Sequence, residues 1–141
     1  MACIAKYFLI DDQVTETDKF DISFLEKGFT IYEVVKLIDG FPLFFEDHIS
    51  RMHHSAELKG VKAWCNDSCI KERVHKLIQL NELKKGRLKF GLRFHSSGNK
   101  FISFFLENIE PDIEVYDKGI EIISERYERK SPNAKVINYL L

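Results

Sequence analysis

The chain has 141 residues, of which 45% are hydrophobic and 30% are charged, a composition typical of a globular protein with one buried core and not of a disordered chain. Its 21 basic and 22 acidic residues are mixed along the sequence and give a net charge of -1, which argues against nucleic acid or a membrane surface as a partner. Without a secretory leader pattern or a long apolar run, we expect a cytosolic protein.

The first elements in chain order are β-strands. Residues 3–10 are rich in β-forming side chains, and Asp11-Asp12 predicts a turn into a short return strand over residues 13–16.

The clearest hairpin joins a long β-forming run, residues 29–38, to residues 41–45. The Asp39-Gly40 pair between them is a strong signal for a type I′ turn. Pro42 cannot donate a ladder hydrogen bond, so we expect its strand to start late or to lie at a sheet edge.

Two amphipathic helices follow the hairpin. The first is indicated by apolar residues at helical spacing and has Gly60 in a C-capping position. The second begins at a capping residue within 66–68 and ends at Asn81 or Gly86. The two apolar stripes are Phe45, Ile49, Met52 and Ala56 in the first helix, and Ile70, Val74, Leu77 and Ile78 in the second.

The second half of the chain again reads as strands, over residues 87–95, 100–109 and 119–125. Ser131-Pro132 then predicts a helix start, with residues 134–141 continuing as helix. This order of elements argues for an α+β fold in which a largely antiparallel sheet is covered by two packed helices.

The cysteines are expected to be free thiols. Cys3, Cys65 and Cys69 make an odd number in a chain that lacks a secretory pattern. Cys65 and Cys69 lie near His75, but no second pair of ligands completes a structural zinc site, so we favour thiols over metal ligands.

Two cationic residues suggest a specific chemistry. Arg51 shares one flank of the first helix with His48 and Ser55, and a guanidinium suits a phosphate. Lys135 lies among apolar neighbours, which would favour a neutral amine that can react with an aldehyde. Taken separately, each is more often a solvated surface charge. Together they suggest pyridoxal phosphate (PLP) as a cofactor.

The segments that carry these residues resemble the N-terminal half of class IV aminotransferases, a family that includes D-amino-acid and branched-chain aminotransferases and aminodeoxychorismate lyase. The resemblance runs from an aromatic-Glu strand, Tyr32-Glu33, through a Gly turn to a His-x-x-Arg helix and a Lys-x-x-Asn segment that starts at Lys135. It spans roughly residues 28 to 141 and implies a small N-terminal domain over residues 1–123. Residues 124–141 would then be a linker and the start of a larger cofactor-binding domain.

The resemblance also implies roles for particular residues. Lys135 would be the catalytic lysine that holds the PLP aldehyde and moves protons, and Arg51 would bind the PLP phosphate. Tyr32 and Lys36 would line the substrate side, with Arg93 as a weaker candidate for carboxylate binding and His95 beside it. The implied substrates are an amino acid and a 2-oxo acid, and the implied assembly is a homodimer.

Strand alternation creates one conflict with these roles. Tyr32, Val34 and Lys36 share one face of their strand, so Glu33 faces the apolar layer on the other side. A carboxylate in that position requires a buried partner.

The chain also departs from the family pattern. Where many members carry Gly-Asp-Gly before the aromatic-Glu strand, this chain has Glu26-Lys27-Gly28. In the family, the carboxylate that pairs with the cofactor's ring nitrogen and the backbone amides that cradle its phosphate come from sequence beyond Leu141. We therefore expect this polypeptide alone to be a weak or inactive aminotransferase. Two alternatives stay open: a lyase of the same fold, and a non-catalytic α+β binding or assembly module.

Overall fold

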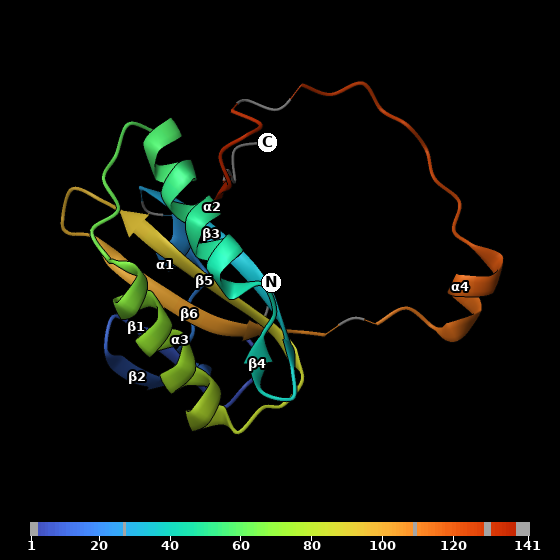
Figure 1. The fold of residues 1–141 in the computed structure, drawn as a ribbon, viewed down its shortest axis with the longest axis horizontal. Helices are drawn as coiled ribbons and strands as arrows, with labels where there is room; N and C mark the ends of the chain where they lie inside the picture. The colour runs from blue at the N-terminus through green and yellow to red at the C-terminus, as the bar shows by residue number, and fades with distance from the viewer. Residues whose placement is uncertain (1–2, 27, 109, 129–130, 138–141) are drawn as a thin grey trace.

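A computed structural model of the protein describes residues 3–26, 28–108, 110–128 and 131–137. Its centre is a seven-stranded sheet in the order β2-β1-β6-β5-β3-β4, with β7 also paired to β3, and every pairing is antiparallel (Figure 1). The predicted α+β class with an antiparallel sheet is therefore confirmed. The strands are β1 (Tyr7–Ile10), β2 (Gln13–Glu16), β3 (Phe29–Ile38), β4 (Phe41–Pro42), β5 (Gly86–Phe94), β6 (Lys100–Leu106) and β7 (Val136–Ile137). The helices are η1 (Thr17–Lys19), α1 (Ser23–Glu26), α2 (Phe45–Leu58), α3 (Asp67–Asn81) and α4 (Ile113–Lys118).

The predicted hairpin is formed by β3 and β4. Asp39 and Gly40 both have positive φ, 51° and 83°, as a type I′ turn requires. Strand β4 lies at the end of the sheet order, which agrees with the edge position expected for Pro42. The strand is shorter than predicted because α2 begins at Phe45.

Both long helices cover one face of the sheet (Figure 1). Each buries its whole predicted stripe, and the strand residues of that face, such as Ile31 and Phe90, belong to the same core. At the start of α3, the side chain of Asn66 accepts a hydrogen bond from the Cys69 backbone N–H at 2.9 Å. Gly60, just after α2, has the positive φ of 68° expected of a helix C-terminus.

The opposite face of the sheet carries a second, smaller core. Phe8, Leu25, Ile102 and Phe104 are buried there. The register pairs Tyr32 with Gly91 and Gly91 with Ile102, so Tyr32 lies on this second face and Glu33 lies on the face covered by α2.

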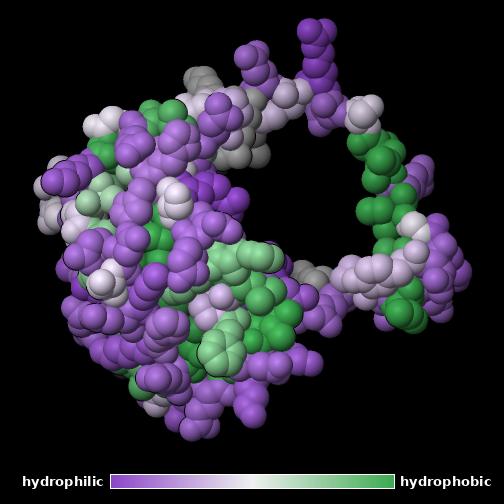
Figure 2. All heavy atoms as spheres, viewed as in Figure 1, coloured by the Kyte–Doolittle hydropathy of each residue, from purple (hydrophilic) through white to green (hydrophobic). Residues whose placement is uncertain are grey.

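The chain between β6 and β7 is a long excursion away from the sheet (Figure 1). It contains α4, which the sequence analysis did not predict, and no strand over residues 119–125, so that predicted strand is wrong. Its apolar side chains are exposed, among them Ile122 (81%) and Ile123 (90%), and Figure 2 shows this part of the excursion as hydrophobic. These side chains have the apolar character of a strand, but they pair with none of the strands that the structure describes.

The helix predicted from residue 134 is also wrong where the structure describes it. Val136 and Ile137 form β7, which pairs antiparallel with Ile31 and Thr30 of β3. Two β-branched residues beside an open strand edge gain ladder hydrogen bonds and packing that a short terminal helix lacks. The remainder of that predicted helix, residues 138–141, lies outside the described residues.

The three cysteines are free thiols. Within the described ranges, no cluster of three or more His, Cys, Asp or Glu side chains is arranged to hold a metal ion. The same part of the chain contains no helix with the length and hydropathy needed to cross a membrane.

Gly91 is required by the close approach of β3 to β5. A Cβ atom at this position would lie 2.8 Å from the Ile31 carbonyl oxygen and 3.0 Å from Thr30 Cγ2. We predict that Gly91→Ala lowers the free energy of unfolding by about 1–3 kcal/mol, because the backbone must shift to admit the methyl group. Urea denaturation measures the loss. Ser96→Ala, in the exposed turn after β5, should change stability little, and equal stability of both variants would contradict the prediction.

Candidate active site

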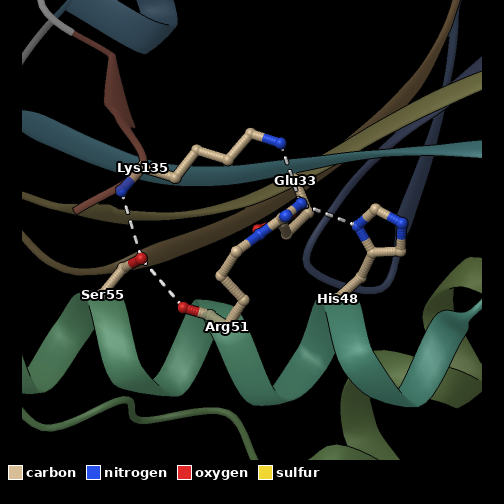
Figure 3. Close-up of polar contacts among 5 residues, drawn as sticks. All are labelled: Glu33, His48, Arg51, Ser55 and Lys135. Atoms are coloured by element: carbon tan, nitrogen blue, oxygen red, sulfur yellow. Dashed lines mark hydrogen bonds and ion pairs between the residues drawn. The ribbon is translucent and has the colours of Figure 1, made fainter. Parts of the chain in front are cut away.

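The site centres on the buried carboxylate of Glu33, which is fully inaccessible to solvent and faces α2. Arg51 donates to it twice, from Nε to Oε1 at 2.7 Å and from Nη2 to Oε2 at 2.6 Å. His48 Nδ1 lies 2.8 Å from Oε2, and Lys135 Nζ donates to Oε2 at 3.0 Å. Figure 3 shows the three side chains converging on Glu33 from α2 and from the segment before β7. These contacts provide the partner that strand alternation requires for this carboxylate.

Helix α2 positions three residues of the site. His48, Arg51 and Ser55 lie on one flank, as their spacing predicts, and this flank faces β3 (Figure 3). The Ser55 hydroxyl donates to the Arg51 carbonyl oxygen at 2.8 Å and accepts from the Lys135 backbone N–H at 3.1 Å. Ser55 therefore ties the backbone of the lysine segment to the helix that carries the arginine.

Strand pairing brings Lys135 to this helix. The Tyr32 backbone N–H donates to the Lys135 carbonyl oxygen at 3.1 Å, which continues the ladder between β3 and β7. Tyr32 and Lys135, which are distant in the sequence, thus meet at one edge of β3.

The electrostatics keep Glu33 ionised. Burial alone raises the pKa of this carboxyl, but the hydrogen bonds from Arg51, His48 and Lys135 outweigh burial and lower the pKa below its ordinary value of 4.5. The hydrogen bond to Glu33 in turn raises the pKa of Arg51. The site therefore holds a carboxylate anion that is shared by cationic groups.

Lys135 does not have the apolar surroundings predicted from its neighbours. Ala134 and Val136 are buried, yet the lysine side chain keeps 27% of its surface exposed and its Nζ atom forms an ion pair with Glu33. The difference arises because Ala134 and Val136 pack into the main core, while the Lys135 side chain leaves the strand edge and its amine reaches the carboxylate.

Tyr32 brings a second lysine to the site. Its ring lies 5.4 Å from Lys135 Nζ and 4.2 Å from Lys89 Nζ, measured to the ring centroid. Lys89, on β5, is only 3% exposed, and burial together with the charge of Lys135 lowers its pKa to about 8. The sequence analysis missed Lys89. Lys89 and Arg93 are an even number of residues apart, so strand alternation places both on the same face of the sheet as Tyr32. The burial of Lys89, however, depends on the assembled sheet.

The remaining predicted residues do not join the Glu33 cluster. Lys36 is exposed and lies 4.0 Å from Glu110. Arg93 is buried, with its guanidinium 3.9 Å from the centroid of Phe24 and hydrogen-bonded to the Phe24 carbonyl oxygen at 3.2 Å. His95 Nδ1 contacts Ser97 Oγ at 2.7 Å in the turn after β5. Among the described contacts, these side chains interact with residues near the ends of the strands and not with Glu33.

A family model described as amino-transferase class IV matches residues 30–141, most of the chain. The chain therefore belongs to the class IV aminotransferase family.

Solved structures of aminotransferases share the fold of the chain. It is similar to the Escherichia coli branched-chain amino acid aminotransferase, with a TM-score of 0.61 and 16% identity over 73% of this chain and 40% of that one. It is also similar to a fold IV-transaminase from Curtobacterium pusillum, with a TM-score of 0.57 and 16% identity over 74% and 43%. A hypothetical aminotransferase from Mycobacterium tuberculosis in a PLP-bound form gives a TM-score of 0.58 and 15% identity over 71% and 39%. The chain thus spans about two fifths of the length of these structures.

The donor set of the site fits PLP. The cofactor carries an aldehyde and a phosphate, which require an amine and a strong cationic hydrogen-bond donor. Lys135 Nζ and Arg51 Nη2 both contact the same oxygen of Glu33, so the amine and the guanidinium lie close to each other. The Arg51 side chain is half exposed, which leaves part of the guanidinium open to an anion.

Replacing Glu33 tests how strongly the site depends on its charge. We predict that Glu33→Gln lowers the free energy of unfolding at neutral pH by about 2–3 kcal/mol, because three donors lose their anionic acceptor. Because the folded-state pKa of Glu33 lies below 4.5, the stabilisation is complete above pH 4.5 and disappears as pH falls through the lower value. The gap between the two proteins should therefore close in acid.

Urea titrations at several pH values measure this gap. Glu72→Gln, on the exposed surface of α3, serves as the matched control and should show a small difference from the wild type. A Glu33→Gln deficit that stays constant into acid would contradict the assignment of charge to Glu33.

Proposed function

We propose that this chain supplies the lysine and the phosphate-binding arginine of a PLP-dependent enzyme that transfers an amino group between an amino acid and a 2-oxo acid. One observation carries the proposal. Arg51 and Lys135, which are distant in sequence and belong to different elements, meet at a single buried carboxylate. Membership of the class IV aminotransferase family supports the same pair of roles.

In this proposal Arg51 binds the phosphate and Lys135 binds the aldehyde. When bound, PLP supplies the electron sink that makes the α-carbon proton of an amino acid acidic. Lys135 Nζ, released from the aldehyde by the amine of the substrate, would remove and return a proton at that carbon as a general base and acid. Tyr32, whose ring centroid lies 5.4 Å from Lys135 Nζ, would flank the substrate.

Glu33 acts as a positioning residue. It holds Arg51 through two parallel hydrogen bonds, which orient the guanidinium without occupying its whole surface. It holds Lys135 through one hydrogen bond, so the amine can leave the carboxylate while Ser55 still binds the lysine's backbone N–H. The arginine is therefore fixed and the lysine is free to turn.

The transfer reaction is proposed for a protein that also supplies the rest of the fold, since the chain spans about two fifths of the solved aminotransferases. Cofactor capture by Lys135 needs only groups that this chain contains. It can be tested on the chain itself.

The first test locates the reactive lysine. After incubation with PLP and reduction with borohydride, peptide mapping should find the phosphopyridoxyl label mainly on Lys135. Lys135→Arg should lose the label and the associated visible absorbance, whereas Lys89→Arg should keep both. Lys89 is the informative control because its lowered pKa makes it the competing amine. Labelling of Lys89, or of surface lysines at random, would refute the role of Lys135.

The second test isolates the phosphate contact. We predict that Arg51→Gln reduces the preference of the chain for PLP over pyridoxal, which lacks the phosphate, by about tenfold or more, since a charged hydrogen bond is worth about 1.5–3 kcal/mol. Absorbance titration with each aldehyde measures the preference. Arg126→Gln, exposed in the excursion, should leave it unchanged. An unchanged preference in Arg51→Gln would remove Arg51 from the phosphate site.

A further inference from the structure

Two thiols lie against each other at the start of α3, on residues that the proposed function does not use. Cys65 is the last residue before the capping residue Asn66, and Cys69 is in the first turn of the helix. Their sulfur atoms are 2.7 Å apart. A disulfide bond is shorter, about 2.05 Å. The thiols are therefore separate but need only a small approach to become bonded.

The helix cap holds the two thiols together. Asn66 Oδ1 accepts the Cys69 backbone N–H at 2.9 Å, which fixes the turn between the two cysteines. Cys65 is 1% exposed and belongs to the main hydrophobic core, whereas Cys69 is partly exposed. A reagent from solvent can therefore reach Cys69 first.

Burial separates the roles of the two thiols. Arg73, one turn along α3, donates from Nη1 to Cys65 Sγ at 3.6 Å and is itself held by Asp12 at 2.9 Å. Burial and the neighbouring Cys69 raise the pKa of Cys65 to about 12, so Cys65 is a poor initial nucleophile. Cys69 is the partly exposed thiol of the pair and lies in the first turn of α3, near Arg73.

We propose that Cys65 and Cys69 form an oxidation site that closes an intrachain disulfide by exchange with a low-molecular-weight disulfide such as oxidised glutathione. The Cys69 thiol gives its proton to solvent and its sulfur attacks one sulfur of the reagent, which forms a mixed disulfide and releases one thiolate. Cys65 then loses its proton to solvent and attacks the Cys69 sulfur, which releases the second thiolate. Two protein thiols are oxidised and one reagent disulfide is reduced to two thiols.

Cys3 provides an internal reference. Its thiol contacts the Thr17 hydroxyl at 3.6 Å and forms an isolated bridge with Leu106, on another part of the sheet. It has no sulfur neighbour among the described contacts, so exchange at Cys3 should stop at the mixed disulfide.

The test exposes the full chain to oxidised glutathione and follows free thiols, intact mass and peptide map. We expect Cys65 and Cys69 to disappear together, with the loss of two hydrogen atoms and no glutathione on either residue, and to return with dithiothreitol. Cys3→Ser should behave in the same way at this pair. Persistence of both thiols, or stable glutathione on Cys69 in the wild type, would overturn the proposal.

Single substitutions test the order of attack. Cys65→Ser should trap glutathione on Cys69, because the resolving thiol is gone, while Cys69→Ser should leave Cys65 largely unreacted. As a measurement that needs no oxidant, the wild type should bind one phenylarsine oxide across the pair, and each single variant should lose this binding. Arsenical binding that survives in either variant would show that the two thiols do not act together.

Discussion

The structure depends on one ionised carboxylate placed where strand alternation requires an apolar side chain. Glu33 lies on the face of β3 that Ile31 and Val35 line with the main core. A buried carboxylate without partners is strongly unfavourable, so its neighbours must provide matched donors. Here the donors are a guanidinium, an imidazole and an ammonium. Because the core cannot bury an unpaired carboxylate, the donors that surround Glu33 are also the groups that can bind an anion.

The sheet provides the edge on which these donors meet. Strands β4 and β7 pair with β3 at different ends of it, β4 near Leu37 and β7 near Thr30. The turn after β4 leads directly into α2, which carries Arg51 past Glu33, while β7 brings Lys135 to the same point. The arrangement separates the two faces of β3, with the carboxylate on the helix side and Tyr32 on the other. Lys135, at the strand edge, contacts both.

Most of the fold follows from local sequence patterns. The Asp39-Gly40 turn and the apolar stripes of α2 and α3 are each encoded within a few neighbouring residues, and each has the predicted form. The helical period likewise places His48 and Arg51 on the same flank of α2. These features do not depend on which distant segment packs against them.

Features that depend on contacts with distant residues could not be predicted from the local sequence. Residues 136–137 are compatible with a helix by composition, and only the free edge of β3 makes them a strand. Residues 119–125 have strand-like composition, but they pair with none of the described strands. Strand alternation predicts that Glu33 needs a buried partner, but its three donors come together only when the strands and α2 assemble. The same is true of Lys89, whose burial results from tertiary packing and has no sequence signal of its own.

The excursion between β6 and β7 separates the site into parts with different stability. Glu33, His48 and Arg51 belong to a hairpin and its adjoining helix, which are close in sequence and need little chain entropy to assemble. Lys135 is attached through a two-residue strand at the end of a long tether whose described residues up to 133 are almost all exposed. We therefore expect this strand to open locally more readily than the rest of the sheet. The arginine half of the site belongs to a hairpin and its adjoining helix, whereas the amine half belongs to a short strand at the end of a long exposed segment.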